Sequence, residues 1–356
     1  MNLINYLDSF IAIAITGIIT CYLTLNSVID VSKKKKLFDE PNETRKIHKS
    51  KTPNLGGIGI FFSFIFSITI VLPKFITGYL PYLIASSLII FAIGVKDDLV
   101  TLNPTKKFSA QLLSGLILTL IGDIRITNTY GLFGYFELSY PVSIILTILF
   151  YVYLFNSFNL IDGIDTLAGG IGLIGCLTFC FLFYKIGYVG ESIMSFGLAV
   201  ILSIFLYFNY SPAKIFMGDT GSIFLGFMIC FFSIRFIEIK PILLHSKSIF
   251  YSKPAIVLSI IIIPFYDTSR VFFLRIINGK SPFIADNNHI HHKFINLGYT
   301  HLQTSFILIS FNLILIISTI LLDKIGTNQI ILFDLLLTTI GYIFVWFLPK
   351  KTKTPF

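Results

Sequence analysis

Five short polar clusters interrupt an otherwise apolar chain. They are Lys96-Asp97-Asp98, the segment from Asn156 to Asp165, Gly218-Asp219-Thr220-Gly221-Ser222, the segment from His289 to His292, and the basic run from Lys33 to Lys51. Carboxylates and amides are ligands for Mg²⁺, whereas imidazoles and lysines attract phosphate oxygens. If one membrane face gathers all five clusters, they could support a metal-dependent reaction on a phosphorylated lipid.

Two successive acids, Asp97 and Asp98, follow Lys96 at the end of an apolar stretch. Two anions at the C-terminus of a helix oppose the helix dipole, which favours cations there. A divalent cation or Lys96 could compensate them. For this pair taken alone, a solvated helix end is the simpler explanation.

The second cluster combines two amides with two acids. Asn156 and Asn159 are three residues apart, so they lie on one face of a helical turn. Asp162 and Asp165 flank Gly163, and Asp165 could cap the next helix. Capping accounts for one acid but not for the whole set, so the segment favours a ligand site.

The third cluster opens another apolar stretch with two glycines. Gly218 and Gly221 would let the backbone approach a ligand, and amides exposed at a helix N-terminus attract phosphate oxygens. Asp219 could hold Mg²⁺ against that phosphate, because Mg²⁺ commonly takes one or two carboxylates together with phosphate oxygens. A plain helix start is the alternative.

Histidine and basic side chains form the last two clusters. His289, His291 and His292 have no Cys or Glu at zinc spacing, so hydrogen bonding to a diphosphate fits them better than zinc does. A solvated histidine group is the alternative. Arg45 and Lys46 could clamp phosphate where the chain re-enters the membrane, while the basic run as a whole also fits attraction to lipid headgroups.

The composition indicates the elements that must position these clusters. A mean hydropathy of +0.84 with 55% hydrophobic and 13% charged residues excludes a soluble domain. Apolar windows of ~20 residues recur about eleven times along the chain. We therefore predict an all-α polytopic membrane protein with about eleven transmembrane helices, forming one integral membrane domain over residues 1–356.

The loops indicate how the helices are oriented. Lys and Arg concentrate in the loops that lie inside if the N-terminus is outside and the C-terminus is cytoplasmic. That orientation places all five polar clusters on the inner face. On the outer side, alternating residues at 124–127 and 135–138 around Gly131 and Gly134 predict a short periplasmic β-hairpin.

The net charge of +9 follows from the same inner-face bias. It predicts anionic lipids and phosphorylated substrates as partners. Nucleic acid is not expected, because no soluble surface interleaves basic and aromatic residues. A homodimer is compatible with the sequence, which does not determine the oligomeric state.

Taken in order, the motifs resemble those of the polyprenyl-phosphate N-acetylhexosamine-1-phosphate transferases. The motifs are Lys96-Asp97-Asp98, Asn156-x-x-Asn159-x-x-Asp162-Gly163-x-Asp165, Gly218-Asp219-x-Gly221-Ser222 and His289-Ile290-His291-His292, within a motif core of about residues 39–293. His-Ile-His-His is similar to the branch that starts O-antigen, enterobacterial common antigen or teichoic-acid linkage units. The peptidoglycan branch, phospho-N-acetylmuramoyl-pentapeptide translocase, typically has three adjacent histidines and is the alternative.

The resemblance implies a reaction and a location. UDP-N-acetylhexosamine, most often UDP-GlcNAc, would react with undecaprenyl phosphate to give the lipid diphosphate-sugar and UMP. The ion would be Mg²⁺, with Mn²⁺ as an alternative. The enzyme would lie in the bacterial inner membrane with its active site at the cytoplasmic face.

The resemblance also implies a role for each matched residue. Asp219 and Asn159 would bind the metal, Phe216 would stack on uracil and Asp165 would face it. Asp97 and Asp98 would act on the lipid phosphate; since that phosphate is mostly dianionic above a pKa of about 6, we favour electrostatic and orienting roles over a base or a covalent aspartyl-phosphate. The full predicted set is catalytic Asp97, Asp98 and Asp162, metal-binding Asp219 and Asn159, and substrate-binding Asn156, Asp165, Phe216, His289, His291, His292, Lys293, Arg45 and Lys46.

Two residues depart from the family pattern. Thr166 stands where the family usually has Gly, so the geometry of this turn is not determined by the resemblance. Lys293 stands where Arg is common. The second change replaces a bidentate fork by a point charge.

An ion-coupled transporter is the alternative class. Transporter sites usually lie near the membrane midplane, often within repeated halves. Here the acids lie at span ends, and the one embedded pair, Arg235 and Glu238, is expected to neutralise itself near the outer rim.

Overall fold

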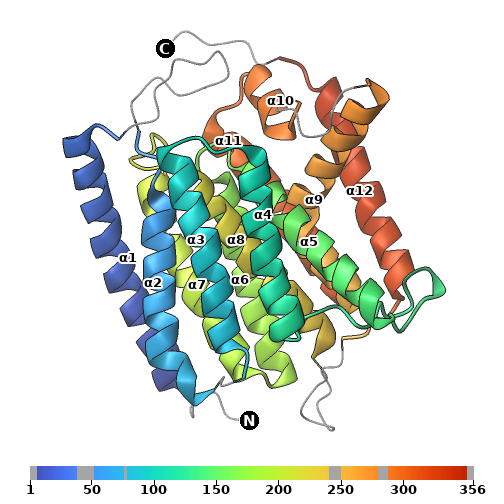
Figure 1. Ribbon diagram of the computed structural model, residues 1–356. Coiled ribbons are helices and arrows are strands. Elements are labelled where there is room, and N and C mark those ends of the chain that lie inside the picture. The colour runs from blue at the N-terminus through green and yellow to red at the C-terminus, as the bar shows by residue number, and fades with distance from the viewer. Residues whose placement is uncertain (1–5, 38–51, 76–77, 240–249, 280–287, 351–356) are drawn as a thin grey trace.

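The computed structural model describes residues 6–37, 52–75, 78–239, 250–279 and 288–350 (Figure 1). Arg45 and Lys46 lie outside the described residues. The helices of the described chain are α1 (Leu7–Lys35), α2 (Gly56–Val71), α3 (Leu80–Leu99), α4 (Pro104–Leu116), α5 (Tyr140–Ile161), α6 (Leu167–Ile186), α7 (Val189–Asn209), α8 (Gly218–Glu238), α9 (Lys253–Ile277), α10 (Ile290–Asn296), α11 (His301–Leu321) and α12 (Thr327–Phe347).

All eleven predicted apolar windows fall on helices of this bundle. In the described part of the chain, 9 helices are long and apolar enough to cross a membrane. The other two windows are α2, with 16 residues, and α4, with 13, which continues as the π-helical turn Ile117–Ile121. The remaining helix, α10, has only 7 residues.

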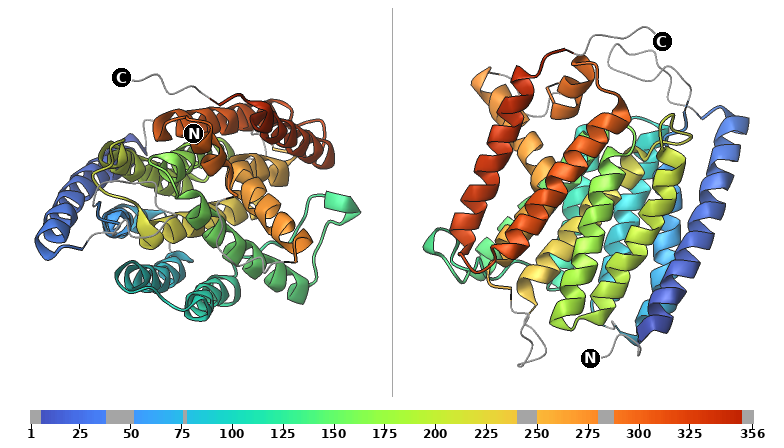
Figure 2. Two further views of the ribbon diagram at one scale, coloured as in Figure 1. Left: turned by 90° about the horizontal axis from the view of Figure 1, so that it is seen from above. Right: turned by 180° about the vertical axis from the view of Figure 1, so that it is seen from behind.

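Helix α8 forms the interior of the bundle. In its most apolar window 94% of the residues are buried, compared with 22% in α1, which lies at the edge (Figure 2). α8 contacts α2, α3, α5, α6 and α9. Gly94 permits the close approach of α3, since a Cβ there would lie 2.6 Å from Thr220 Cα.

The polar clusters gather at one end of the bundle, where α3 and α5 end and α8 begins. We call this the polar end; α10 lies there too, at the top of Figure 1. α1 begins at the opposite end, whereas α12 ends on the same side as α10. Among the described residues, the four clusters other than the basic run therefore share one face.

The predicted periplasmic hairpin is wrong. The described part of the segment between α4 and α5 has no strand, only an isolated antiparallel bridge between Asn128 and Glu137 and a 3₁₀ turn, Leu132–Gly134. The Thr127 N–H, which a longer ladder would use, instead donates to Glu238 Oε1 at 2.7 Å. Side-chain capture of this backbone group limits strand pairing.

The expected pairing of Arg235 with Glu238 is also wrong. Arg235 forms an ion pair with Glu191 at 2.6 Å, and Tyr79 donates to the same carboxylate oxygen at 2.8 Å. Glu238 is held by Thr127. The ion pair joins α7 to α8, and the Tyr79 hydroxyl joins the start of α3 to them, at the end opposite the predicted site.

Candidate functional site

Asp98 joins the end of α3 to the beginning of α8. Its carboxylate accepts hydrogen bonds from Asp219 N at 2.7 Å, Thr220 N at 3.0 Å and Thr220 Oγ1 at 2.5 Å. An anion at a helix N-terminus satisfies free amides and complements the helix dipole. The sequence allowed amides at this helix N-terminus to attract phosphate oxygens, but the amides of Asp219 and Thr220 bind Asp98 instead.

Lys107 of α4 lies between two carboxylates. Its Nζ is 3.1 Å from Asp97 Oδ2 and also pairs with Asp219 Oδ2. Asp97 accepts a further hydrogen bond from Leu102 N at 2.7 Å. Asp97 and Asp219 therefore converge on one cationic atom, whereas Asp98 faces the helix backbone.

Lys107 and its neighbour on the same helix face, Gln111, were not among the predicted site residues. The two are four residues apart, and Gln111 Oε1 accepts a hydrogen bond from Asn156 Nδ2 at 3.1 Å. The available signal was this spacing in the first helix after Asp98, because residues four apart project from one face.

Asn159 reaches the same group from α5. Its Nδ2 donates to Asp219 Oδ1 at 2.8 Å and to Ser222 Oγ at 3.0 Å. Asp219 thus contacts residues from α4 and α5, and it lies beside Asp98 of α3. The predicted metal pair, Asp219 and Asn159, is brought together.

Asp162, the half-buried C-cap of α5, lies close to the same cluster. Desolvation raises the pKa of its carboxyl well above the ordinary value, and the neighbouring charges of Asp219, Asp98 and Asp165 raise it further. The site therefore disfavours another negative charge at Asp162 and would favour a cation or a proton there.

Asp165 is buried against α11. Its Oδ2 lies 3.4 Å from His301 Nδ1, and its backbone carbonyl accepts a hydrogen bond from Ser305 Oγ at 2.7 Å. The N-cap of α6 is Thr166, at φ 68°, so Asp165 does not have the capping role that the sequence allowed. Thr166 adopts the left-handed conformation that favours glycine.

The predicted aromatic contact, Phe216, lies in the connection before α8. Its N–H donates to Pro53 O at 2.8 Å, and its carbonyl accepts from Gly56 N at 2.9 Å. These bonds join the α7–α8 connection to the start of α2. The Phe216 ring is partly exposed at the polar end.

A buried network holds the histidine segment. Asp267 of α9 lies 2.8 Å from His289 Nδ1, accepts from Ile290 N at 3.1 Å, and pairs with Arg270 at 3.1 Å. Arg270 also donates to the Asn288 carbonyl. Asp267 was not among the predicted site residues, because its position in an apolar helix gave no motif.

His291 packs against the loop between α5 and α6. A Cβ on Gly163 would lie 2.4 Å from His291 Nε2, so a larger residue there would require the ring to shift. Burial lowers the pKa of His291 to about 3. His291 stacks on His289 with ring centroids 5.8 Å apart and lies 4.3 Å from the His292 ring. The structure thus brings the histidine segment onto the Asp162–Asp165 segment.

Buried nitrogens in this segment have free hydrogen-bonding capacity. Within the described residues, His289 Nε2 and both ring nitrogens of His291 have no hydrogen-bond partner. Unpaired buried polar atoms cost free energy unless a ligand or water satisfies them. The two imidazoles are therefore suited to a polar ligand.

The donor set fits a cation that is shared with substrate. In the described part of the chain, no group of three or more His, Cys, Asp or Glu could hold a metal ion alone. However, Asp97 and Asp219 already share the Lys107 ammonium. A Mg²⁺ ion with one or two carboxylates and substrate phosphate oxygens fits such a pair.

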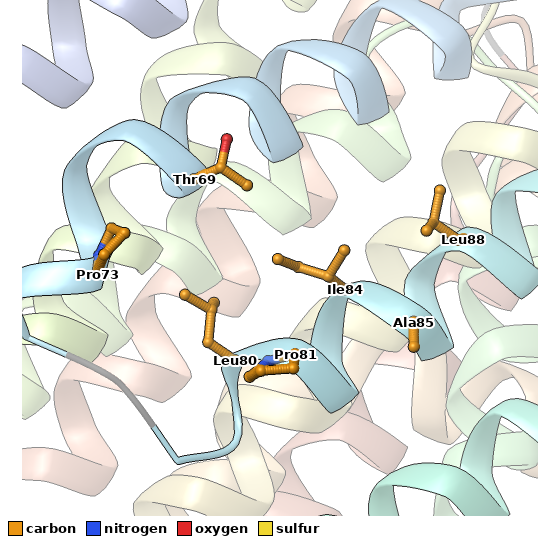
Figure 3. A pocket seen from close by; sticks show the side chains of 7 residues that line it. All are labelled: Thr69, Pro73, Leu80, Pro81, Ile84, Ala85 and Leu88. Atoms are coloured by element: carbon orange, nitrogen blue, oxygen red, sulfur yellow. The ribbon is translucent and has the colours of Figure 1, made fainter.

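An apolar pocket lies away from the polar end, between the last turns of α2 and the first half of α3 (Figure 3). Its volume is about 560 Å³. Thr69 is its one hydroxyl-bearing residue; the lining is Thr69, Pro73, Leu80, Pro81, Ile84, Ala85 and Leu88. Without charged groups, this pocket is unsuited to a diphosphate.

Comparison with known proteins identifies the class. The profile of glycosyl transferase family 4 matches residues 80–237. The chain is 32% identical over 316 residues to a probable undecaprenyl-phosphate N-acetylglucosaminyl 1-phosphate transferase of Bacillus subtilis (strain 168), covering 87% of this chain and 84% of that protein.

Two further relatives agree. Identity is 29% over 289 residues to the undecaprenyl-phosphate alpha-N-acetylglucosaminyl 1-phosphate transferase of Escherichia coli O157:H7, covering 79% of this chain and 74% of the relative. Identity is 28% over 312 residues to the decaprenyl-phosphate N-acetylglucosaminephosphotransferase of Mycobacterium tuberculosis (strain CDC 1551 / Oshkosh), covering 81% of this chain and 76% of the relative.

The chain belongs to glycosyl transferase family 4, the multi-pass membrane enzymes that transfer sugar-1-phosphate groups. The transporter alternative is therefore excluded as the class of this protein. The histidines and α9 to α12 lie outside the matched interval of residues 80–237.

Proposed function

We propose that this enzyme transfers N-acetylglucosamine-1-phosphate from UDP-GlcNAc to undecaprenyl phosphate at the cytoplasmic face of a bacterial plasma membrane. A lipid phosphate oxygen would form a bond to the sugar-bearing phosphorus, and the bond from that phosphorus to the bridging oxygen of the diphosphate would break, so that the bridging oxygen leaves with UMP. The convergence of Asp97, Asp219 and Lys107 carries this proposal. The names of the relatives support the same substrates.

The geometry divides the acids between two tasks. Asp98 orients the first turn of α8, which fixes Asp219 next to Asn159. In place of the predicted metal pair Asp219 and Asn159, we assign Mg²⁺ to Asp219 and Asp97 together with diphosphate oxygens, because both carboxylates already share one cation. Asn159 would position Asp219, to which its amide donates. Bound Mg²⁺ would neutralise charge that develops on the transferring phosphate. Lys107 would leave the carboxylates and pair with phosphate.

The other predicted residues would complete the substrate site. His289 and His291 have buried nitrogens that could hydrogen-bond to the diphosphate or sugar. Phe216 and Asp165 are the proposed uracil contacts, and His292 and Lys293 extend the histidine segment. Since phosphoryl transfer depends on positioning and charge neutralisation, this set would suffice without a covalent enzyme intermediate.

The test is UMP release by the purified full-length protein with undecaprenyl phosphate and Mg²⁺. The sugar panel comprises UDP-GlcNAc, UDP-GalNAc and UDP-N-acetylmuramoyl-pentapeptide. We expect UDP-GlcNAc to react fastest. Preference for the muramoyl-pentapeptide would identify the peptidoglycan reaction instead. If no UMP is released with any of the three UDP-sugars, the proposal is refuted.

A pair of variants tests the metal assignment. Asp219→Ala should lower UMP release by about a hundredfold or more, because it removes a preorganised electrostatic group. Asp8→Ala is the matched control, since Asp8 is an exposed acid in the first turn of α1, at the other end of the bundle. Equal activity of both variants would remove Asp219 from the metal site.

A further inference from the structure

Trp346, near the end of α12, lies beside two cations of the polar end. Lys293 Nζ is 4.9 Å from the centroid of its ring, and the Arg270 guanidinium carbon is 5.4 Å from it. Tyr342, one helical turn earlier, lies 5.8 Å from the same guanidinium carbon. Cations within about 6 Å of an aromatic ring are attracted to its face, most strongly for Trp.

The two cations come from different parts of the histidine network. Arg270 is paired with Asp267, which also holds His289, whereas Lys293 follows the histidine motif on α10. Among the described residues, no carboxylate forms an ion pair with Lys293. Its charge is therefore available to an anion beside the unpartnered imidazole nitrogens of His289 and His291.

We propose that Trp346 is a positioning residue of the sugar-nucleotide site, whose ring holds Lys293 and Arg270 beside the His289 and His291 imidazoles so that both cations face the diphosphate. This proposal rests on the function proposed above. It gives a function to the end of α12 at the polar end, which lies outside the interval matched by the family profile.

Like charges oppose this arrangement unless something offsets them. Arg270 and Lys293 both lie over the Trp346 ring, and of these two cations Asp267 pairs with Arg270. A bound diphosphate would supply the missing negative charge. Binding should therefore change the environment of Trp346 while both cations remain over its ring.

The kinetic test compares Trp346→Leu with Trp346→Phe in the full-length enzyme. Loss of the aromatic face should raise KM for UDP-GlcNAc about 3- to 30-fold, on the order of one cation–π contact, with kcat changed less than about twofold. Trp346→Phe should recover most of the loss. Phe347→Leu, at a neighbouring side chain that is 80% exposed, is the matched control and should behave as wild type.

The binding test uses fluorescence, since the chain contains 1 Trp. Titration with UDP-GlcNAc and Mg²⁺ should change the emission saturably in the wild type, and Lys293→Met should reduce the change. An unaltered KM in Trp346→Leu, or unresponsive emission in an enzyme that releases UMP, would overturn the positioning role. Absence of UMP release in the wild type would instead overturn the function.

Discussion

At the scale of single residues, Asp97 and Asp98 have different surroundings although they are adjacent. Asp98 is saturated by hydrogen bonds from the first turn of α8, whereas Asp97 shares Lys107 with Asp219. A sequence motif treats the two acids as one pair. The structure separates an orienting carboxylate from one that faces the shared cation.

Replacement of Lys107 by Met should make the protein dependent on divalent cations for stability. Asp97 and Asp219 would then face each other without a counter-charge, which is costly for partly buried groups. We expect a lower melting temperature in EDTA and recovery in millimolar Mg²⁺, since saturation at about 100 times Kd stabilises by ~2.7 kcal/mol. Wild type should respond less.

The control is Lys106→Met, because the neighbouring Lys106 is exposed. Its melting temperature should follow the wild type in both buffers. If Lys107→Met is as stable in EDTA as in Mg²⁺, the carboxylates do not share a cation site.

His291 should make stability depend on acid pH. Its pKa is about 3 in the folded protein, compared with an ordinary value of 6.5, so the unfolded state binds the proton more readily. The stabilisation is complete above pH ~6.5 and falls as the pH drops toward 3, by at most ~1.4 kcal/mol per pH unit. Melting temperatures of wild type and His291→Gln between pH 7 and 5 check this. Parallel curves would contradict the assignment.

At the scale of helices, the site depends on how closely α3 approaches α8. Gly94 lies against Thr220, one turn of α3 before Asp98, and the Asp98 carboxylate reaches the amides of Asp219 and Thr220. Positioning within fractions of an ångström matters for phosphoryl transfer. Helix packing thus determines whether the acids converge.

Gly94→Ala should separate α3 from α8 and lower activity. A Cβ at this position would lie 2.6 Å from Thr220 Cα, so the helices must shift, and overpacking of this kind costs about 1–3 kcal/mol. UMP release should fall at least about tenfold. Gly78→Ala is the matched control, because a Cβ there meets nothing within 4 Å. Full activity of Gly94→Ala would show that the interface tolerates the shift.

The sequence was informative about helices and less so about contacts between them. Apolar windows predicted eleven of the helices because the length of an apolar run is a local property of the sequence. Lys107 and Asp267 were missed, since their importance arises only when α4 and α9 bring them to Asp219 and His289. The hairpin was wrong because Glu238, over a hundred residues away, captures the Thr127 amide.

At the scale of the whole molecule, segments that are distant in the chain form one polar end. α3, α5, α8 and α10 contribute Asp97, Asn159, Asp219 and His291, and α4 contributes Lys107 (Figures 1 and 2). Helix α8, which begins at this end, is enclosed by the other helices, and 94% of its most apolar window is buried. A soluble sugar nucleotide and a membrane lipid could meet only at such an end.

The orientation of the molecule can be tested with two single-cysteine labels. Lys214→Cys lies at the polar end between α7 and α8, and Ser139→Cys lies at the opposite end before α5; both positions are exposed. The excess of basic loop residues at the polar end predicts that this end faces the cytoplasm. In intact spheroplasts, a membrane-impermeant maleimide should therefore label Ser139→Cys, and label Lys214→Cys only after permeabilisation.

The native cysteines require a parental control, although Cys21, Cys176 and Cys230 are buried. The reverse labelling pattern would place the site outside, where cytoplasmic UDP-sugars could not reach it.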